Sequence, residues 1–239
     1  QLKNKLNLKI DYVVNFGGDV DHHSKNVFRS HFNGCKNLAD IFKKKKIGKF
    51  IQIGSSVEYA NQAAPHAEIN KNIQFNQLKS MYAKAKLSST IYLLDLFKKE
   101  KFPVIILRPY LIYGPGQEIN RLIPFVIKNC IEDNNFPCSD GQQLRDFIYI
   151  DDAIDLIFKS LTNKKIVGEI FNLCSGKPTK VKRIIDFIRK KINKGKPNYG
   201  LIPLRKDEVI KFYGNPNKTK KFLNWKTNIT IKKGLSKTI

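Results

Sequence analysis

Cysteine and histidine are scarce in this chain of 239 residues, and they form no recognisable ligand or nucleophile set. No Cys-x-x-Cys pair occurs among the four cysteines, Cys35, Cys130, Cys138 and Cys174. The four histidines, at positions 22, 23, 31 and 66, form no triad with a nucleophile. These absences argue against a zinc site or a disulfide framework, so we expect no metal, reduced thiols and a cytoplasmic location.

Long hydrophobic runs are also missing. The strongest run, Val104–Leu107, has the length of a strand, whereas about 20 apolar residues are needed to cross a bilayer. The sequence opens at Gln1 with a polar, lysine-rich stretch and has no leader pattern. We therefore expect no membrane segment. Because there is no initiator Met, we also expect that the natural chain starts upstream of Gln1.

Acidic residues are few, and the formal net charge is +24. Clustered basic residues would suggest nucleic-acid binding, because they release counterions from phosphate. Only seven of the 44 basic residues are arginine, however, and the lysines are spread along the whole chain. Readers of nucleic acid favour arginine for bidentate contacts, and no DNA- or RNA-binding motif is present. We expect no nucleic-acid partner, although the charge can steer an anionic substrate.

Short apolar runs alternate with helical patterns in the first half of the chain. Strands are predicted at Ile10–Phe16, Lys49–Ile53 and Val104–Leu107, and long helices at His23–Lys46 and Asn76–Lys99. Buried strands that alternate with helices favour an α/β fold with a doubly wound parallel sheet.

After Pro109 the pattern is looser. It predicts strands at Phe147–Ile150 and Glu169–Leu173 and helices at Leu122–Ile131, Asp151–Leu161, Lys180–Ile192 and Asn217–Leu223. We expect residues 1–115, with 146–175 returning to them, to form the core. Residues 116–145 and 176–239 should form a smaller lobe against it.

A Tyr-x-x-x-Lys spacing joins Tyr82 to Lys86 within the second long helix. Residues four apart lie on one helix face, so the phenol and the ammonium can point into the same site. A phenol is a poor base at neutral pH, and a nearby cation favours its phenolate. With nine tyrosines and so many lysines, about one such spacing is expected by chance. The surrounding sequence must therefore decide.

That surrounding sequence holds an ordered series of motifs. In chain order they are Ile53-Gly54-Ser55-Ser56-Val57-Glu58-Tyr59 before Tyr82, then Arg108-Pro109-Tyr110-Leu111-Ile112-Tyr113-Gly114-Pro115-Gly116, Gly141-Gln142-Gln143-Leu144-Arg145-Asp146-Phe147, Phe171-Asn172-Leu173-Cys174-Ser175-Gly176 and Lys221-Phe222-Leu223-Asn224-Trp225. The series resembles the extended short-chain dehydrogenases/reductases, in the branch of NAD-dependent nucleotide-sugar epimerases and dehydratases. The resemblance runs from about Asp11 to the C-terminus.

The resemblance implies a Rossmann-like core that binds NAD or NADP, a lobe that binds a nucleoside-diphosphate sugar, and three catalytic residues. Tyr82 would transfer the proton at the sugar oxygen. Lys86 would hold the nicotinamide ribose and lower the pKa of Tyr82. Ser55 would hydrogen-bond the same sugar oxygen, with Ser56 beside it at the substrate.

The resemblance also implies binding residues outside this set. Phe16, Gly17, Pro109 and Tyr110 would lie against the cofactor, together with Tyr82 and Lys86. Arg145 would contact the diphosphate or nucleotide of the substrate, and Arg121 stands where the family often has a second basic contact.

Each of these residues also has a plain structural interpretation. Ser55 and Ser56 can be turn residues at a strand end. Arg145 can form a local ion pair with Asp146, and Arg121 can be a solvated charge at a helix start. Asp151 and Asp152 are more typical of helix caps than of catalytic groups.

The chain departs from the family at three places. The Gly-x-x-Gly-x-x-Gly turn that holds the pyrophosphate is absent. We therefore expect that about two βα units, about 60 residues, precede Ile10–Phe16 in the whole protein. Dehydratases have Asp-Glu after the active-site hydroxyl, where this chain has Ser56-Val57. His31 stands where the family often has Asn.

We therefore expect a 4-epimerase or a 4-keto reductase acting on a nucleotide sugar. A dehydratase, or an NAD(P)-binding protein without catalysis, is the alternative. The family resemblance also implies a homodimer formed through the two long helices. Ile91, Leu94 and Phe97 are candidates for its apolar contact surface.

Overall fold

The computed structural model describes the chain except for residues 1–8, 20–23, 69–74, 164 and 206–207. The start of the helix predicted from His23 therefore falls outside the described residues. No helix in the described part of the chain is long and apolar enough to span a membrane.

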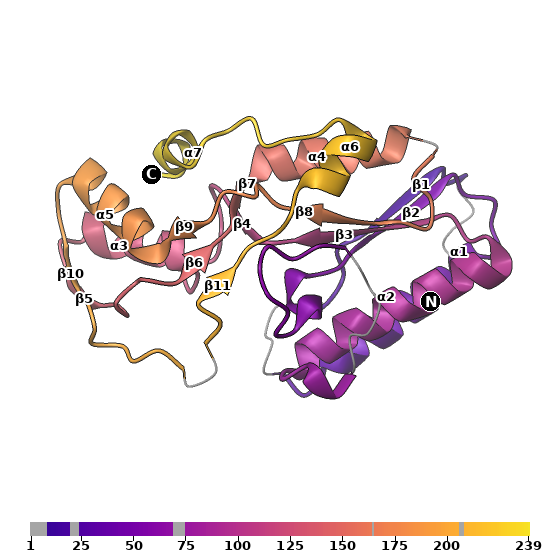
Figure 1. The fold of residues 1–239 in the computed structure, drawn as a ribbon, viewed down its shortest axis with the longest axis horizontal. Helices are drawn as coiled ribbons and strands as arrows, with labels where there is room; N and C mark the ends of the chain where they lie inside the picture. The colour runs from indigo at the N-terminus through magenta and orange to yellow at the C-terminus, as the bar shows by residue number, and fades with distance from the viewer. Residues whose placement is uncertain (1–8, 20–23, 69–74, 164, 206–207) are drawn as a thin grey trace.

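A parallel four-stranded sheet forms the centre of the molecule (Figure 1). Its strands lie in the order β1 (Tyr12–Asn15), β2 (Lys49–Ile53), β3 (Val104–Pro109) and β8 (Ile170–Leu173). All four were predicted, and the α/β class with a doubly wound parallel sheet is confirmed. In the described residues the strand order runs in one direction and contains no reversal.

The side chains of the two central strands alternate between the two faces of the sheet, as the period of a strand requires. Phe50, Val104 and Ile106 face α1 (Gly34–Phe42) and α2 (Met81–Glu100), which lie on one side (Figure 1). On the other side Ile51, Ile105 and Leu107 belong to a second cluster with residues of α4 (Ile150–Thr162) and α6 (Asn217–Leu223).

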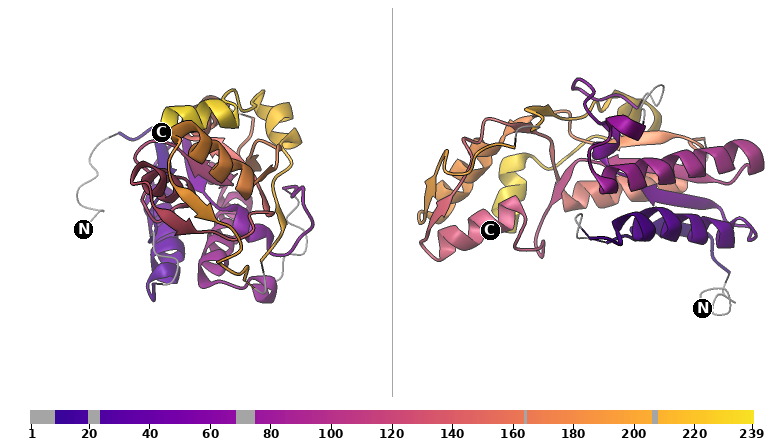
Figure 2. Two further views of the ribbon diagram at one scale, coloured as in Figure 1. Left: turned by 90° about the vertical axis from the view of Figure 1, so that its left-hand side faces the viewer. Right: turned by 90° about the horizontal axis from the view of Figure 1, so that it is seen from below.

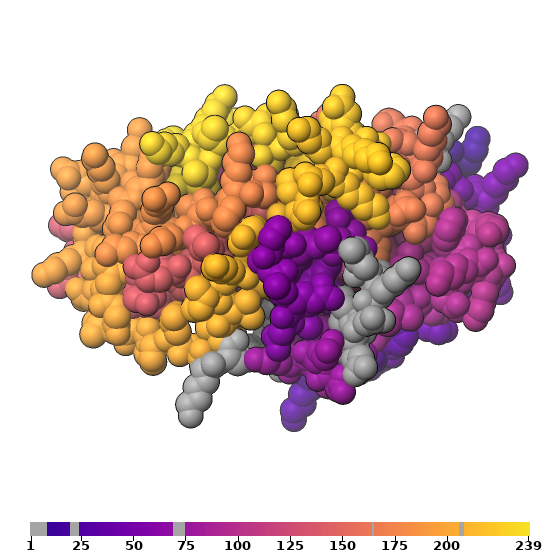
Figure 3. Space-filling view, in the orientation of Figure 1, coloured from indigo at the N-terminus to yellow at the C-terminus, as the bar shows by residue number. Residues whose placement is uncertain are grey.

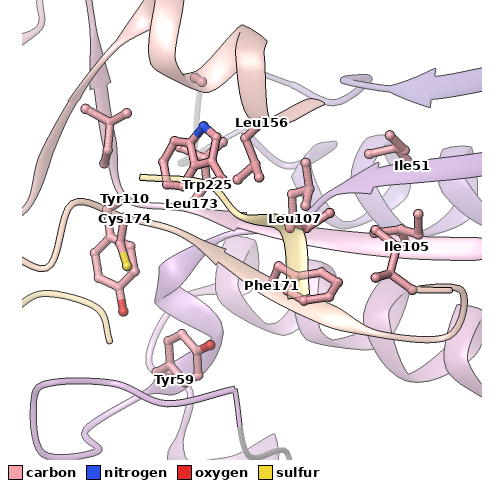
Figure 4. Close-up of a cluster of buried hydrophobic side chains, with 14 residues drawn as sticks. Ile51, Tyr59, Ile105, Leu107, Tyr110, Leu156, Phe171, Leu173, Cys174 and Trp225 are labelled. Atoms are coloured by element: carbon pink, nitrogen blue, oxygen red, sulfur yellow. The ribbon is translucent and has the colours of Figure 1, made fainter. Parts of the chain in front are cut away.

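Trp225 is the largest side chain in this second cluster. Figure 4 shows it beside Leu156 and Leu173, between the sheet and the helix that covers it. It is 1% exposed. The segment after α6 is therefore packed into the core, although residues 176–239 as a whole were assigned to the smaller lobe.

The two long helices differ from their predicted extents. The first consists of a π-helical turn, η1 (Arg29–Asn33), followed directly by α1. The second is broken: a short 3₁₀ turn, η3 (Phe75–Gln77), precedes α2, which begins only after Ser80. The Ser80 hydroxyl accepts a hydrogen bond from Ala83 N–H at 3.1 Å, and such an N-cap fixes where a helix can start.

The remaining elements form a smaller group at the end of the molecule opposite α1 (Figure 2). Its core lies between the helices α3 (Leu122–Ile131), α5 (Val181–Ile192) and α7 (Ile231–Thr238). Short strands connect these helices: β4 (Leu111–Tyr113), β5 (Asn135–Pro137), β6 (Leu144–Arg145), β7 (Phe147–Tyr149), β9 (Thr179–Lys180), β10 (Lys196–Asn198) and β11 (Lys211–Phe212). Of these strands only β7 was predicted, and α7 was missed.

Candidate active site

Ser55 lies at the carboxyl end of β2, where the chain turns into the 3₁₀ helix η2 (Ser56–Tyr59). Its hydroxyl accepts a hydrogen bond from Val57 N–H at 3.4 Å. Its own N–H donates to Glu58 Oε1 at 2.7 Å, so Ser55 and Glu58 form a reciprocal capping box. Ser55 and Ser56 are both buried. Ser55 is thus a turn residue at the strand end, as its structural interpretation expects, and its functional role stays a prediction.

Tyr82 and Lys86 lie one turn apart near the start of α2. Lys86 Nζ is 5.7 Å from the centre of the Tyr82 ring and donates a hydrogen bond to the Ile53 carbonyl at 2.9 Å. Tyr82 is hydrogen-bonded to the Ser55 side chain. The structure thus brings Ser55, Tyr82 and Lys86 together at the carboxyl end of β2, although Ser55 lies about 30 positions before the other two in the sequence.

Burial changes the titration of both α2 groups. Burial raises the pKa of Tyr82, the Glu58 charge raises it further, and the Ser55 hydrogen bond and the Arg121 charge lower it. Burial lowers the pKa of Lys86, and the charge of Glu58 partly offsets this effect. The pKa of Tyr82 is thus raised on balance, and the lowering by Lys86 that the resemblance implies is not among its causes.

His31 packs against the site from the π turn. Its ring meets the Tyr82 ring edge-on, with centres 5.0 Å apart, and its Nε2 lies 3.0 Å from the Asp19 carbonyl. Gly18, at φ +151°, leaves the space that this ring occupies, since a Cβ there would overlap it. The position at which the sequence departs from the family is thus in direct contact with Tyr82.

Phe16 and Gly17 lie at the carboxyl end of β1, on the same edge of the sheet as Ser55. Phe16 is 65% exposed, and Gly17 N–H donates to the Asn15 side chain at 2.9 Å. Both residues are open to a ligand at this edge, as their predicted role requires. That role stays a prediction.

Pro109 and Tyr110 leave the sheet at the end of β3. Pro109 is half-buried, but Tyr110 is only 5% exposed and lies in the core cluster shown in Figure 4. Its hydroxyl is 2.8 Å from His66 Nδ1. The structure thus places the Tyr110 ring in an aromatic core contact, and its contact with a cofactor stays a prediction.

His66 also ties a surface segment to the C-terminal part of the chain. Its N–H donates to the Tyr213 carbonyl at 3.0 Å. Figure 3 shows the purple residues of this segment directly against yellow residues from near the C-terminus. The histidine therefore serves packing, and the sequence offered no signal for this contact.

Arg145 lies in the smaller lobe and is not part of the cluster of Ser55, Tyr82 and Lys86. It forms an ion pair with Glu208 and donates to the Val209 carbonyl at 2.8 Å. Its expected neighbour Asp146 instead accepts hydrogen bonds from Ser175 and Gly176. Arg145 thus pairs with Glu208, 63 positions away in the sequence, and not with the adjacent Asp146.

Arg145 and Glu208 line a cavity of about 390 Å³ whose wall is otherwise largely apolar. The other lining residues include Leu122, Phe125, Val126, Ile185, Leu204 and Arg205. Arg121 directly precedes Leu122, one of the residues that line this cavity, and its charge lowers the pKa of Tyr82. Arg121 itself is exposed.

Three residues of the site were missed from the sequence. Glu58, Thr90 and Arg108 are buried together beneath Ser55 and are linked by hydrogen bonds. An acid at the third position after the strand-end serine was visible, but its partners are 32 and 50 positions away. Within the described residues no cluster of His, Cys, Asp and Glu could hold a metal ion, and the four cysteines are buried free thiols.

Comparison with known proteins gives the family. A model of the NAD dependent epimerase/dehydratase family matches residues 2–174. UDP-glucuronate 4-epimerase of Thermodesulfobacterium geofontis is 29% identical over 88% of this chain and 64% of its own length. CDP-abequose synthase of Salmonella muenchen is 29% identical over 66% of this chain and 56% of its own. This chain thus spans less than two thirds of either relative.

Solved structures agree. UDP-glucuronic acid 4-epimerase of Bacillus cereus, solved as a Y149F mutant with UDP-4-deoxy-4-fluoro-glucuronic acid and NAD, superposes with a TM-score of 0.88. It is 25% identical, and the match covers 98% of this chain and 76% of that one. Family match, motif order and fold coincide, and the chain belongs to the NAD dependent epimerase/dehydratase family.

Proposed function

We propose that this chain contains the proton-transfer site of an NAD(P)-dependent 4-epimerase or 4-keto reductase acting on a nucleoside-diphosphate sugar. The observation that supports it most is the contact between Ser55, Tyr82 and Lys86 at one sheet edge. In the reductive direction the Tyr82 hydroxyl donates its proton to the sugar keto oxygen, and Ser55 hydrogen-bonds the same oxygen. In the oxidative direction Tyr82 takes the proton back, and Lys86 stabilises the phenolate.

The residues present fit one half of a dinucleotide. Bound nicotinamide would supply or accept the hydride beside Tyr82. Lys86 would hold the ribose, and the exposed Phe16 and Gly17 would lie against the ring. For the pyrophosphate, the sequence has no Gly-x-x-Gly-x-x-Gly turn. The described sheet also lacks the reversal of strand order at which such cofactors bind.

The cavity in the smaller lobe supports a nucleotide-sugar substrate. Its apolar wall suits a base and a sugar ring, and Arg145 and Arg205 at that wall suit a diphosphate. Arg121, whose charge acts on Tyr82 and which precedes the cavity residue Leu122, would hold the substrate at both sites. We propose that residues 116–145 and 176–239 supply most of this substrate side, and that 1–115 and 146–175 supply the cofactor side.

The dehydratase alternative needs an acid beside the catalytic hydroxyl, and the contacts of this loop argue against one. Val57 packs against the apolar cluster of Leu78, Ala83 and Leu87. Glu58, the one carboxylate of η2, turns into the protein and pairs with Arg108 at 2.8 Å. The alternative of a binding protein without catalysis leaves the contact of Tyr82 with Ser55 and Lys86 unexplained.

We further propose a cytoplasmic homodimer that does not bind nucleic acid. Ile91 on α2 is 55% exposed, as a contact residue requires, whereas Leu94 and Phe97 are half-buried against the core. Of the three predicted contact residues, Ile91 is the most exposed.

The test uses whichever form of the protein binds the cofactor, this chain or a longer one that contains it. UDP-, CDP- and dTDP-linked sugars and their 4-keto derivatives are supplied with NAD(H) or NADP(H), and products are identified by NMR. We expect inversion at C4 or reduction of a 4-keto group. Water elimination would favour the dehydratase alternative. Binding of a sugar nucleotide without any turnover would favour the protein without catalysis.

A further inference from the structure

One carboxylate beneath the site receives four hydrogen bonds. Glu58 is fully buried. Its Oε1 accepts from Ser55 N–H at 2.7 Å. Its Oε2 accepts from the Thr90 hydroxyl at 2.6 Å, and from Nε and Nη2 of Arg108 at 3.0 and 2.8 Å.

These four bonds join three elements that must keep their relative positions for the chemistry. Ser55 belongs to the turn after β2, Thr90 lies on the helix that carries Tyr82 and Lys86, and Arg108 lies in β3. The sequence makes room for the carboxylate at Gly54, where a Cβ would stand 2.5 Å from Glu58 Oε1. Glycine before the catalytic serine is thus required by the approach of Glu58.

Stability alone does not account for a buried ion pair at this place. Desolvation of two charges costs about as much as their attraction returns, and apolar replacements of similar volume are often equally stable. The Glu58–Arg108 pair differs from an ordinary buried pair in its further contacts. Glu58 also holds the backbone of Ser55 and, through Thr90, the helix α2 that carries Tyr82 and Lys86.

We propose that Glu58 is a positioning residue, which fixes the Ser55 hydroxyl against Tyr82 and sets the charge beneath the proton-transfer site through its pairing with Arg108. This inference rests on the proposed function for the roles of Ser55 and Tyr82. Glu58 itself touches neither substrate nor cofactor in it.

The charge of Glu58 acts on both α2 groups. It raises the pKa of Tyr82 and also that of Lys86. The other titratable or charged groups that face Tyr82 are Lys86 on its own helix, His31 on η1 and Arg121 before α3. Removal of the Glu58 charge therefore leaves an unopposed Arg108 below and should make Tyr82 ionise at lower pH.

The experiment compares Glu58→Gln, Glu58→Asp and the control Glu169→Gln, which breaks an exposed ion pair with Lys218. Ionisation of Tyr82 is followed by the ultraviolet difference between each variant and its Tyr82→Phe derivative. We expect Glu58→Gln to lower kcat on the order of 10- to 100-fold, with KM within about 3-fold and a lower pKa for Tyr82. Glu58→Asp keeps the charge but is one methylene shorter, so the Tyr82 pKa should return while kcat stays low. Glu169→Gln should match the parent protein throughout.

A folded Glu58→Gln protein with the parent kcat and the parent Tyr82 pKa would overturn the proposal. Should that variant fail to fold, Thr90→Val decides, because it removes only the 2.6 Å bond to α2. It should lower kcat about 3- to 10-fold without a change in KM, and a parent kcat would overturn the positioning role. Failure of the proposed function shows itself separately, as turnover that survives Tyr82→Phe.

Discussion

Tyr82 is the residue on which the proposed chemistry depends, and its removal can be tested with little disturbance. Tyr82→Phe deletes one hydroxyl from a half-buried ring. We expect turnover to fall about 10²- to 10⁴-fold with substrate binding largely unchanged, because only the proton-transferring group is lost. The matched control is Tyr12→Phe, at a ring that is 51% exposed at the start of β1. Near-normal turnover by Tyr82→Phe would refute the assignment.

Arg121 gives a second test, with a defined sign. Its positive charge lowers the pKa of Tyr82, because a cation favours the phenolate. Arg121→Met should therefore raise that pKa and move the ionisation of Tyr82 to higher pH. It should also raise KM for the nucleotide sugar if Arg121 holds the diphosphate. Lys128→Met, on the exposed side of α3, is the control, and an equal effect from both variants would count against Arg121.

Contacts between residues within one helix turn could be predicted from the sequence, whereas contacts between residues far apart in the sequence could not. Tyr82 and Lys86 follow from a spacing of four, which the helix itself converts into proximity. The partner of Arg145 lies 63 positions away, and that of Tyr110 lies 44 positions away. No local pattern marks either pair. The family resemblance supplied Ser55 as the third member, because strand order puts distant strand ends at one edge.

At the scale of elements, Lys49 joins β2 to α4 by an arrangement that the sequence did not suggest. Its ammonium is buried and donates to the carbonyls of Ser160 and Leu161 at 2.8 and 2.6 Å, and to that of Asn163. These are carbonyls that a helix end leaves without intrahelical donors. Lys49 is thus a C-terminal cap supplied by a neighbouring strand.

We expect Lys49→Met to lower the free energy of unfolding by about 2 kcal/mol, since a cation at a partly buried helix C-terminus contributes about that much. Urea denaturation followed by circular dichroism measures it. Lys98→Met, at an exposed position of α2, should stay within about 0.5 kcal/mol of the parent. A Lys49→Met protein as stable as the parent would mean that the carbonyls find other donors.

The elements that the sequence predicted best are those whose burial is complete. A strand such as β3 is visible from its uninterrupted apolar run, Val104–Leu107. Strands of two or three residues, such as Leu144–Arg145, have no period to detect and exist through pairing with distant partners. The helix α2 begins later than the predicted start at Asn76, because Ser80 caps its first turn.

At the scale of the whole molecule, the proposed dimer can be tested by a substitution on the exposed side of α2. Ile91→Glu puts a charge on the exposed side of that helix, where burial against a second copy would be costly. We expect sedimentation at micromolar concentration to change from dimer to monomer. Phe158→Glu is the control, because Phe158 is 63% exposed on α4, which covers the other face of the sheet. A parent protein that sediments as a monomer would refute the dimer itself.

Cofactor affinity is the property that the whole sheet determines. In this fold a glycine-rich turn after a strand presents backbone N–H groups and a helix N-terminus to the pyrophosphate. The sequence has no Gly-x-x-Gly-x-x-Gly turn, and the described strands run in one order without the reversal at which the dinucleotide binds. The proposed ribose and nicotinamide contacts of Lys86, Phe16 and Gly17 remain, but they lack an anion site beside them.

We therefore expect the 239-residue chain alone to bind NAD and NADP more weakly than in the micromolar range. Calorimetry and nicotinamide fluorescence measure this directly, with a family member that contains a Gly-x-x-Gly-x-x-Gly turn as the comparison. Micromolar binding by the chain as written would contradict the prediction, because the pyrophosphate would then have a site that neither the motif nor the strand order indicates.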